Sequence, residues 1–211
     1  MYSKDNAATW TKVDWRWNNI GYPVWMNAGK NYSDAKDEFL YFVATDGPSA
    51  YADYPDLIMG RVHRDNVPFK AAYEFFGGAR EAGPATWGRY EDRKPIFSNP
   101  EGCFRPGLEY NSGIDRYMLL ISCPHTEWKW FFNDNPHRAS YFAVYESENP
   151  WGPWNEVVKD RNWNADEDRF QPRIPSKWIS DDGLSFYLLY SCIPRGPYQF
   201  NIHKCQLKTR E

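Results

Sequence analysis

The sequence predicts an all-β fold made of short antiparallel strands. Runs of β-branched and aromatic residues recur along the chain, turn residues separate them, and helical periodicity is hard to find. Aromatic residues make up 18% of the 211 residues, and 16 prolines and 14 glycines accompany them, which is typical of many strands joined by turns. The length suffices for one domain with its own core.

The expected strands alternate with turn signals such as TDGPS, NSGID and SDDG. Each run is rich in the residue types that fit a pleated, half-buried surface. The runs cover residues 38–45, 56–63, 71–76, 105–111, 116–122, 140–147, 154–158, 169–174, 185–191 and 200–207.

The strands repeat as a unit. Three segments align on a proline, namely GYPVW at 21–25, FRPGL at 104–108 and FQPRI at 170–174. Each follows a polar loop and precedes a turn, an aromatic-rich strand, a second loop and a third strand. The first two units continue into a fourth strand. Repeated four-stranded meanders predict the blades of a β-propeller.

We expect about three blades within a single, partial propeller domain that covers residues 1–211. The blades lie roughly at 20–78, 103–159 and 168–208, and residues 1–18 supply the last strand of a preceding or closing blade. Known propellers have four to eight blades. Two arrangements therefore stay open: the chain forms part of a larger, five-bladed propeller, or two copies close a six-bladed ring.

The first residues predict a turn between two strands. The segment SKDNAATW, residues 3–10, has the Ser, Asp, Thr and Trp of the Asp-box S-x-D-x-G-x-T-W, and Ala7 replaces its glycine. Sialidases and other propeller glycosidases contain this box. The same spacing of Ser, Trp and Val recurs at 147–157, and YESENPWGPW is similar to the S-x-x-x-x-G-P-W turn of such propellers.

Residues 20–208 resemble five-bladed propeller glycosidase-like domains, a group that includes arabinanases and β-xylosidases. The box, the WGPW turn and the aligned prolines Pro23, Pro106 and Pro172 carry the resemblance. It implies a carbohydrate-active enzyme, most simply a glycoside hydrolase that acts on a polysaccharide or oligosaccharide by carboxylate acid/base catalysis. A non-catalytic propeller that binds glycan or protein is the alternative, and a polysaccharide lyase is a further one. Arabinanase-type enzymes place three acids on inner strands, and only Glu109 matches that pattern here.

Charged residues occur on two of the expected inner strands. Strand alternation places Arg105, Glu109 and Asn111 on one side of the second, and Gln171 and Arg173 on the equivalent side of the third. A buried acid has to be paired, so the set is either a structural ion pair or a functional site. In the functional interpretation Glu109 is a general acid, and the arginines hold anionic or hydroxyl groups of a substrate.

Glycoside hydrolysis needs a second carboxylate about 5–10 Å from the first. Asp53 and Asp168 are the candidates for this catalytic role, since one lies in the middle of a predicted active-face loop and the other leads into an inner strand. Asp56 is better placed to cap a strand, and Asp168 has the alternative of only solvating an acidic loop. The sequence does not choose between the two candidates.

In a propeller, the loops that enter the innermost strands and those between the second and third strands share one face, which usually carries the site. These loops are expected at 46–55, 77–103, 123–139, 159–168 and 192–198. They bring aromatic residues such as Tyr51, Trp87 and Tyr90.

One of these loops contributes His125, Trp128 and Trp130 as candidate substrate-binding residues, together with Arg105, Asn111, Gln171 and Arg173 of the inner strands. Aromatic rings beside polar groups suit sugars, because the C–H faces of a pyranose pack on rings while its hydroxyls need polar partners. The alternative is that the rings pack against their own loops.

Charge and hydropathy exclude other classes. The net charge is −3 and no basic stripe is present, so we expect no nucleic-acid partner. No run approaches the roughly 18 apolar residues of a membrane span. We expect an extracellular or periplasmic location, although the 211 residues contain no signal peptide. No loop has a recognisable metal-binding pattern, so no metal or other cofactor is expected, with a Ca²⁺ ion on the propeller axis left open.

Four cysteines lack CxxC spacing, which argues against a zinc site. Cys103 and Cys123 lie symmetrically about Gly113 in a predicted hairpin turn. They form either a disulfide across the open end of the hairpin or two buried thiols.

Overall fold

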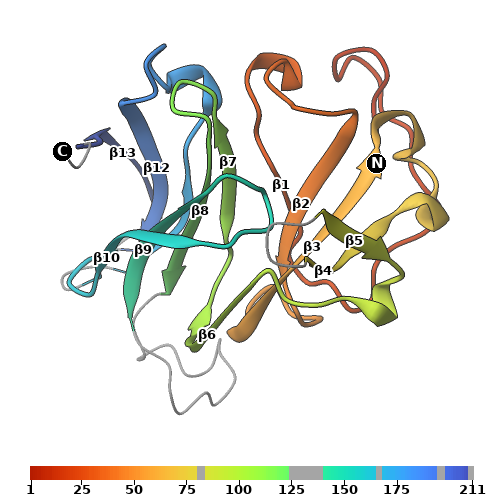
Figure 1. Cartoon of the computed structure of the whole chain (residues 1–211), viewed down its shortest axis with the longest axis horizontal. Helices are drawn as coiled ribbons and strands as arrows, with labels where there is room; N and C mark the ends of the chain where they lie inside the picture. Colours follow the sequence, from red (N-terminus) through yellow and green to blue (C-terminus); the bar gives the residue numbers. More distant parts are fainter. Residues whose placement is uncertain (80–83, 124–139, 165–167, 194–197, 209–211) are drawn as a thin grey trace.

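The computed structural model describes residues 1–79, 84–123, 140–164, 168–193 and 198–208. Within these residues the chain forms three antiparallel β-sheets that follow one another along the sequence (Figure 1), which confirms the all-β prediction. The helices of this part are single 3₁₀ turns at Lys30–Tyr32, Arg64–Asn66, Lys70–Ala72, Tyr90–Asp92 and Ser176–Trp178. None of them has the length and apolar character needed to cross a membrane.

The first sheet has six strands. The first five strands pair in sequence order, and the sixth, β6, pairs with β3. Their bounds are β1 (Val24–Trp25), β2 (Phe39–Thr45), β3 (Tyr54–His63), β4 (Glu74–Ala79), β5 (Ala85–Gly88) and β6 (Phe97–Cys103). The prediction of one long loop over 77–103 is therefore wrong at β5 and β6. β5 pairs with the preceding strand β4, for example Phe76 with Trp87. β6 depends on a partner distant in the sequence, since it pairs Cys103 with Tyr54 and Phe97 with Leu57 of β3.

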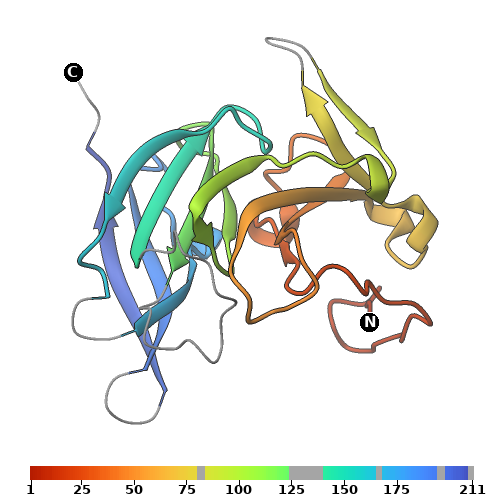
Figure 2. The same ribbon diagram turned by 90° about the horizontal axis from the view of Figure 1, so that it is seen from below.

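The second and third sheets are simple meanders. The second has the order β10-β9-β8-β7, and the third has the order β11-β12-β13. Their bounds are β7 (Gly107–Asn111), β8 (Arg116–Cys123), β9 (Tyr141–Ser147), β10 (Asn155–Asp160), β11 (Asp168–Arg173), β12 (Ser185–Ile193) and β13 (Gln199–Gln206). Figure 2 shows the succession of sheets from below, with the N-terminal residues beside the first sheet.

Apolar layers lie on both faces of the second sheet. On β8, Leu119 and Ile121 belong to the core shared with the first sheet, whereas Met118 and Leu120 belong to the core shared with the third. A strand buried on both faces needs an unbroken apolar run, and this explains the segment RYMLLIS, which does not alternate.

The first strands of the three sheets lie next to one another. Asn27, just after β1, forms a parallel bridge with Glu109 of β7. On the other side of β7, a Cβ added to Gly107 would lie 2.7 Å from the carbonyl oxygen of Pro172 in β11, so only glycine permits this approach. These are the three strands that the prolines align. Their arrangement as propeller blades stays a prediction.

The N-terminal residues form the predicted turn. Tyr2 and Thr11 make an antiparallel bridge, and the Asp5 carboxylate accepts hydrogen bonds from the Thr9 backbone nitrogen at 2.8 Å and its hydroxyl at 2.6 Å. These bonds lower the pKa of Asp5 to about 2. No strand follows over residues 12–19. Instead, Trp15 lies on the outer face of the first sheet and donates from Nε1 to the Pro68 carbonyl at 2.7 Å.

Of the two alternatives for Cys103 and Cys123, the structure has the buried thiols. The Cys103 sulfur donates to the Pro55 carbonyl at 3.5 Å and the Cys123 sulfur to the Gly102 carbonyl at 3.3 Å. Burial raises the pKa of the Cys103 thiol, which keeps it protonated and unreactive.

Asn111 connects the second and third sheets at the end of β7. Its side-chain nitrogen donates to the Gly183 carbonyl at 2.9 Å in a buried position. Gly183 has a φ of 71° and lies so close that a Cβ would approach the Asn111 Oδ1 at 2.4 Å. The predicted substrate-binding role of Asn111 thus gives way to a structural contact between two sheets.

We expect Asn111→Ala to lower the free energy of unfolding by about 1–3 kcal/mol, because a buried carbonyl loses its donor. Urea denaturation followed by tryptophan fluorescence measures this change. Lys12→Ala, at an exposed position, is the matched control and should shift stability by less than about 0.5 kcal/mol. Equal stability of the two variants would contradict a stabilising Asn111–Gly183 contact.

Candidate functional site

The residues before the three aligned prolines come together. They are Tyr22, Arg105 and Gln171, one from each sheet or the segment leading into it. The Gln171 side-chain nitrogen donates to the Tyr22 hydroxyl at 3.1 Å. The Arg105 guanidinium lies 5.2 Å from the centre of the Tyr22 ring. Three residues that the proline alignment makes equivalent in the sequence therefore lie in contact in the structure.

The backbone is strained at two of these positions. Arg105 has a φ of 42° and Gln171 a φ of 59°, although neither is a glycine. The left-handed region costs an ordinary residue about 1–2 kcal/mol. The pairing of β11 with β12 also shifts register between Phe170 and Arg173, which places an irregularity at Gln171. Strain and bulges of this kind concentrate where side chains are aimed at a ligand.

Arg105 is surrounded by aromatic rings. Its Nε donates to the Ala50 carbonyl at 3.0 Å. The guanidinium lies within cation–π distance of four rings, which are Phe104 at 4.9 Å, Tyr51 at 5.0 Å, Tyr22 at 5.2 Å and Phe170 at 6.0 Å. These rings and the carbonyl hold the Arg105 guanidinium in place, and none of them carries a negative charge that would neutralise it.

Two of the nearby rings face solvent. Tyr51 is 53% exposed and Tyr198 is 68% exposed. Tyr198 meets the Phe170 ring edge to face at 6.0 Å, and Phe170 in turn contacts Arg105. The cluster therefore offers ring surface to solvent beside a cation and an amide.

Glu109 lies fully buried among the three first strands. Its Oε1 accepts a hydrogen bond from the Ile174 backbone nitrogen at 3.4 Å, and its Oε2 has no hydrogen-bond partner among the described residues. Burial raises the pKa of Glu109 to about 8, against the smaller opposing effects of a hydrogen bond from Asn27 and the charge of Arg173. Glu109 is accordingly a neutral acid at pH 7.

Arg173 connects Glu109 to the rest of the cluster. Burial lowers the pKa of its guanidinium, while Tyr22 and Glu109 oppose this effect. Arg105 lowers the same pKa further, because the two like charges repel each other. The structure thus brings together four of the predicted residues: Arg105, Glu109, Gln171 and Arg173.

The other predicted residues lie elsewhere or outside the description. Asp53 is fully buried with its carboxylate against Gly102, where a Cβ would meet Oδ2 at 2.1 Å. Asp168 starts β11 and its backbone pairs with Ile193, and nothing is described of its side chain. Three further candidates, His125, Trp128 and Trp130, lie outside the described residues.

Two aromatics expected on the ligand face have a packing role instead. Trp87 meets Tyr41 and Phe76 edge to face and lies 4.1 Å from the Arg61 guanidinium. Tyr90 stacks on Trp17 at 6.2 Å. Tyr198 was not among the candidates, and no feature of its short PYQF context separates it from an ordinary strand residue.

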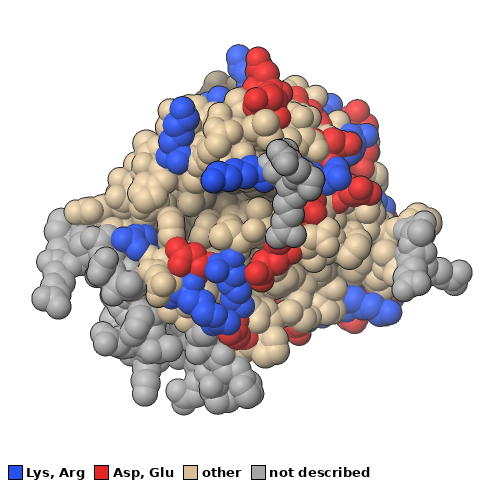
Figure 3. All heavy atoms as spheres, turned by 60° about the vertical axis from the view of Figure 1, so that its left-hand side comes forward, with Lys and Arg blue, Asp and Glu red and all other residues tan. Residues whose placement is uncertain are grey.

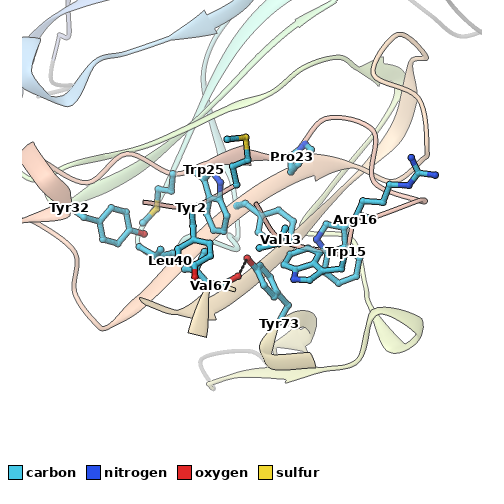
Figure 4. A pocket seen from close by; sticks show the side chains of 14 residues that line it. Tyr2, Val13, Trp15, Arg16, Pro23, Trp25, Tyr32, Leu40, Val67 and Tyr73 are labelled. Carbon is cyan, nitrogen blue, oxygen red and sulfur yellow. Dashed lines mark hydrogen bonds between the residues drawn. The ribbon is translucent and has the colours of Figure 1, made fainter. Parts of the chain in front are cut away.

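Apart from the cluster around Arg105, a hollow lies on the outer face of the first sheet (Figure 4). It has a volume of about 470 Å³, and its lining includes Tyr2, Trp15, Trp25, Leu40 and Tyr73. The Tyr73 hydroxyl already donates to the Val67 carbonyl at 2.9 Å. The lining of this hollow consists mainly of aromatic and aliphatic side chains and contains no Asp or Glu. Without a carboxylate, the hollow is not suited to acid/base catalysis.

Surface charge and metal ligands add little to this picture. On the face shown in Figure 3, basic and acidic side chains are interspersed. Among the residues that the structure describes, no group of three or more His, Cys, Asp or Glu side chains could hold a metal ion.

No protein-family model matches the sequence, and no curated protein matches it significantly. Among solved structures, the chain is similar to a "putative exo-beta-1,3-galactanase" from Bifidobacterium bifidum s17, with 11% sequence identity and a TM-score of 0.40. The match covers 83% of this chain and 50% of that one, so the chain spans about half the length of the protein it matches. A similarity of this size transfers neither fold nor activity.

The burial of Glu109 predicts how stability varies with pH. The folded-state pKa of about 8 lies above the 4.5 of an exposed glutamate. From pH 5 to 8 the unfolded chain has lost this proton while the folded chain keeps it, so the free energy of unfolding falls as pH rises, by at most about 1.4 kcal/mol per unit. Glu109→Gln removes the titrating group. Urea titrations of both proteins should show the stability of the native chain, relative to the variant, declining across this range. A constant difference would refute the neutral acid.

Proposed function

We propose that the chain is a carbohydrate-active module of a β-propeller, and that it hydrolyses glycosidic bonds with Glu109 as the general acid. This proposal is supported mainly by the buried carboxyl of Glu109, whose pKa is raised and which feels the charge of Arg173. Arg173 in turn interacts with Tyr22 and Arg105, and Arg105 lies beside the exposed ring of Tyr51. The adjacent first strands of three successive meanders support the propeller arrangement. The remaining blades, from a longer chain or a second copy, and an extracellular or periplasmic location belong to the same proposal.

The chemistry assigns a role to each group. A carboxyl with a pKa near 8 holds a proton at neutral pH and can give it to a leaving glycosidic oxygen. The Gln171 amide and Tyr22 hydroxyl suit sugar hydroxyls, and the tyrosine rings suit the C–H faces of the ring. The second carboxylate is assigned to Asp168, since β11 also carries Gln171 and Arg173. The burial of Asp53 against Gly102 makes it the weaker candidate.

A non-catalytic glycan-binding module is the second candidate function. Glu109 has no exposed surface in the described structure, whereas a general acid must come within hydrogen-bond distance of the bond it cleaves. If the carboxyl stays covered, the arginines, the amide and the rings remain as a binding site without acid catalysis.

Glu109→Gln separates these candidates. Hydrolysis predicts that release of reducing sugar from a panel of plant and microbial polysaccharides falls at least about 100-fold, because a side-chain general acid contributes 10²–10⁴-fold. Binding of the same glycans, measured by calorimetry, should persist, since glutamine keeps the shape of the side chain. Glu148→Gln, exposed on the turn after β9, is the control and should keep full activity.

Unchanged turnover in Glu109→Gln would refute Glu109 as the acid. Binding without turnover by both the native chain and the variant would establish the binding module in place of the hydrolase.

A further inference from the structure

Half of the ten arginines that the structure describes pair closely with a carboxylate. They do so at 3.0 Å or less, and they are Arg61, Arg64, Arg93, Arg116 and Arg161. Arg105 and Arg173 make no ion pair of this kind within the described part of the chain. Arg105 donates to the Ala50 carbonyl at 3.0 Å, and Arg173 donates to the Pro172 carbonyl at 2.7 Å. Arg173 also interacts with the Tyr22 hydroxyl and with Glu109.

Both guanidiniums lie partly buried in one cluster. Each keeps donors that the carbonyl contacts do not use, since a guanidinium has five N–H groups. Burial is the main cause that lowers the pKa of Arg173, and repulsion by the Arg105 charge lowers it slightly further. Buried charge without a counter-ion is costly, so the arrangement is best satisfied by an anion from outside the chain.

The nearby acid does not supply that counter-charge. Glu109 is fully buried and protonated at neutral pH, so the cluster around Tyr22 keeps the positive charge of two guanidiniums. The strained backbone of Arg105 and the irregular pairing near Gln171 hold these side chains at the cluster despite their cost. Stability alone would favour a glycine or a regular strand at these positions.

We propose that Arg105 and Arg173 bind the oxyanion of an acidic sugar, either the carboxylate of a uronate or a sulfate ester. This inference rests on the proposed carbohydrate function and names its substrate class. The planar guanidinium fork matches both oxyanions with paired hydrogen bonds. Gln171 and Tyr22 are placed to contact the hydroxyls of the same sugar, and Tyr51 offers ring surface beside Arg105.

The test compares two acidic oligosaccharides with a neutral one. Calorimetry at low salt measures binding of an oligogalacturonide, of the same oligosaccharide after reduction of its carboxyl groups, and of a sulfated galactose oligosaccharide. We expect the acidic ligands to bind roughly 10- to 100-fold more tightly than the neutral one, the range that one or two charge-assisted hydrogen bonds give. The preference should shrink as salt rises. Which acidic ligand binds more tightly identifies the oxyanion.

Variants locate the preference within the chain. Arg105→Gln places at this position the residue type that Gln171 already has in the equivalent, equally strained backbone, so it is expected to fold. Arg105→Gln and Arg173→Gln should each reduce binding of the acidic ligand about tenfold while leaving the neutral ligand unaffected. Arg105→Lys keeps the charge and should retain part of the preference. Arg116→Gln, at the opposite end of the β7–β8 hairpin, is the control and should bind as the native chain does.

Equal binding of the acidic and carboxyl-reduced ligands by the native chain would overturn the proposal without reference to any variant. So would a preference that survives both glutamine variants. Because the readout is binding, a chain that prefers acidic ligands but hydrolyses none would refute the hydrolase and keep the oxyanion site. A chain that hydrolyses neutral glycans and shows no preference for acidic ligands would refute the oxyanion site and keep the hydrolase.

Discussion

The burial of one carboxyl group at the meeting point of three sheets constrains the rest of this structure. Glu109 belongs to β7, its backbone bridges Asn27 beside β1, and its side chain accepts from Ile174 after β11. A carboxyl removed from water is tolerated only when it is neutral or paired. The three first strands must therefore keep their spacing, because any widening would admit water to Glu109 and favour its charged form.

This constraint explains features that carry no chemistry themselves. Gly107 lets β11 approach β7, and the contact between Asn111 and Gly183 fixes the far ends of the second and third sheets. With both ends fixed, the residues that enter the strands are brought close as well. Convergence of Arg105 and Gln171 is thus a consequence of packing elsewhere along the same strands, and their strained backbones are held by it.

Much of the fold follows from local pattern, whereas the site follows only in part. Strands β2, β3, β8, β9 and β12 are long aromatic or β-branched runs, and the sequence locates them closely. The segment of β6, FSNPEGC, contains the residues of a loop and becomes a strand only through its pairing with β3. Alignment on the prolines predicts that Arg105 and Gln171 occupy equivalent positions, because each directly precedes its proline in the sequence. The burial of Asp53 depends on the pairing of Tyr54 with Cys103, and a single sequence does not contain that information.

The acid and the cationic cluster are coupled through Arg173. The charge of Arg173 favours the ionised form of Glu109, and burial outweighs this effect. An anion bound between the two arginines would cancel part of that positive field and place a negative charge near the carboxyl, so the pKa of Glu109 would rise further. By linkage, protonation of Glu109 would tighten the binding of the anion to the same degree. An acidic sugar would then secure, by its own binding, the proton that general acid catalysis requires, and a neutral sugar would not.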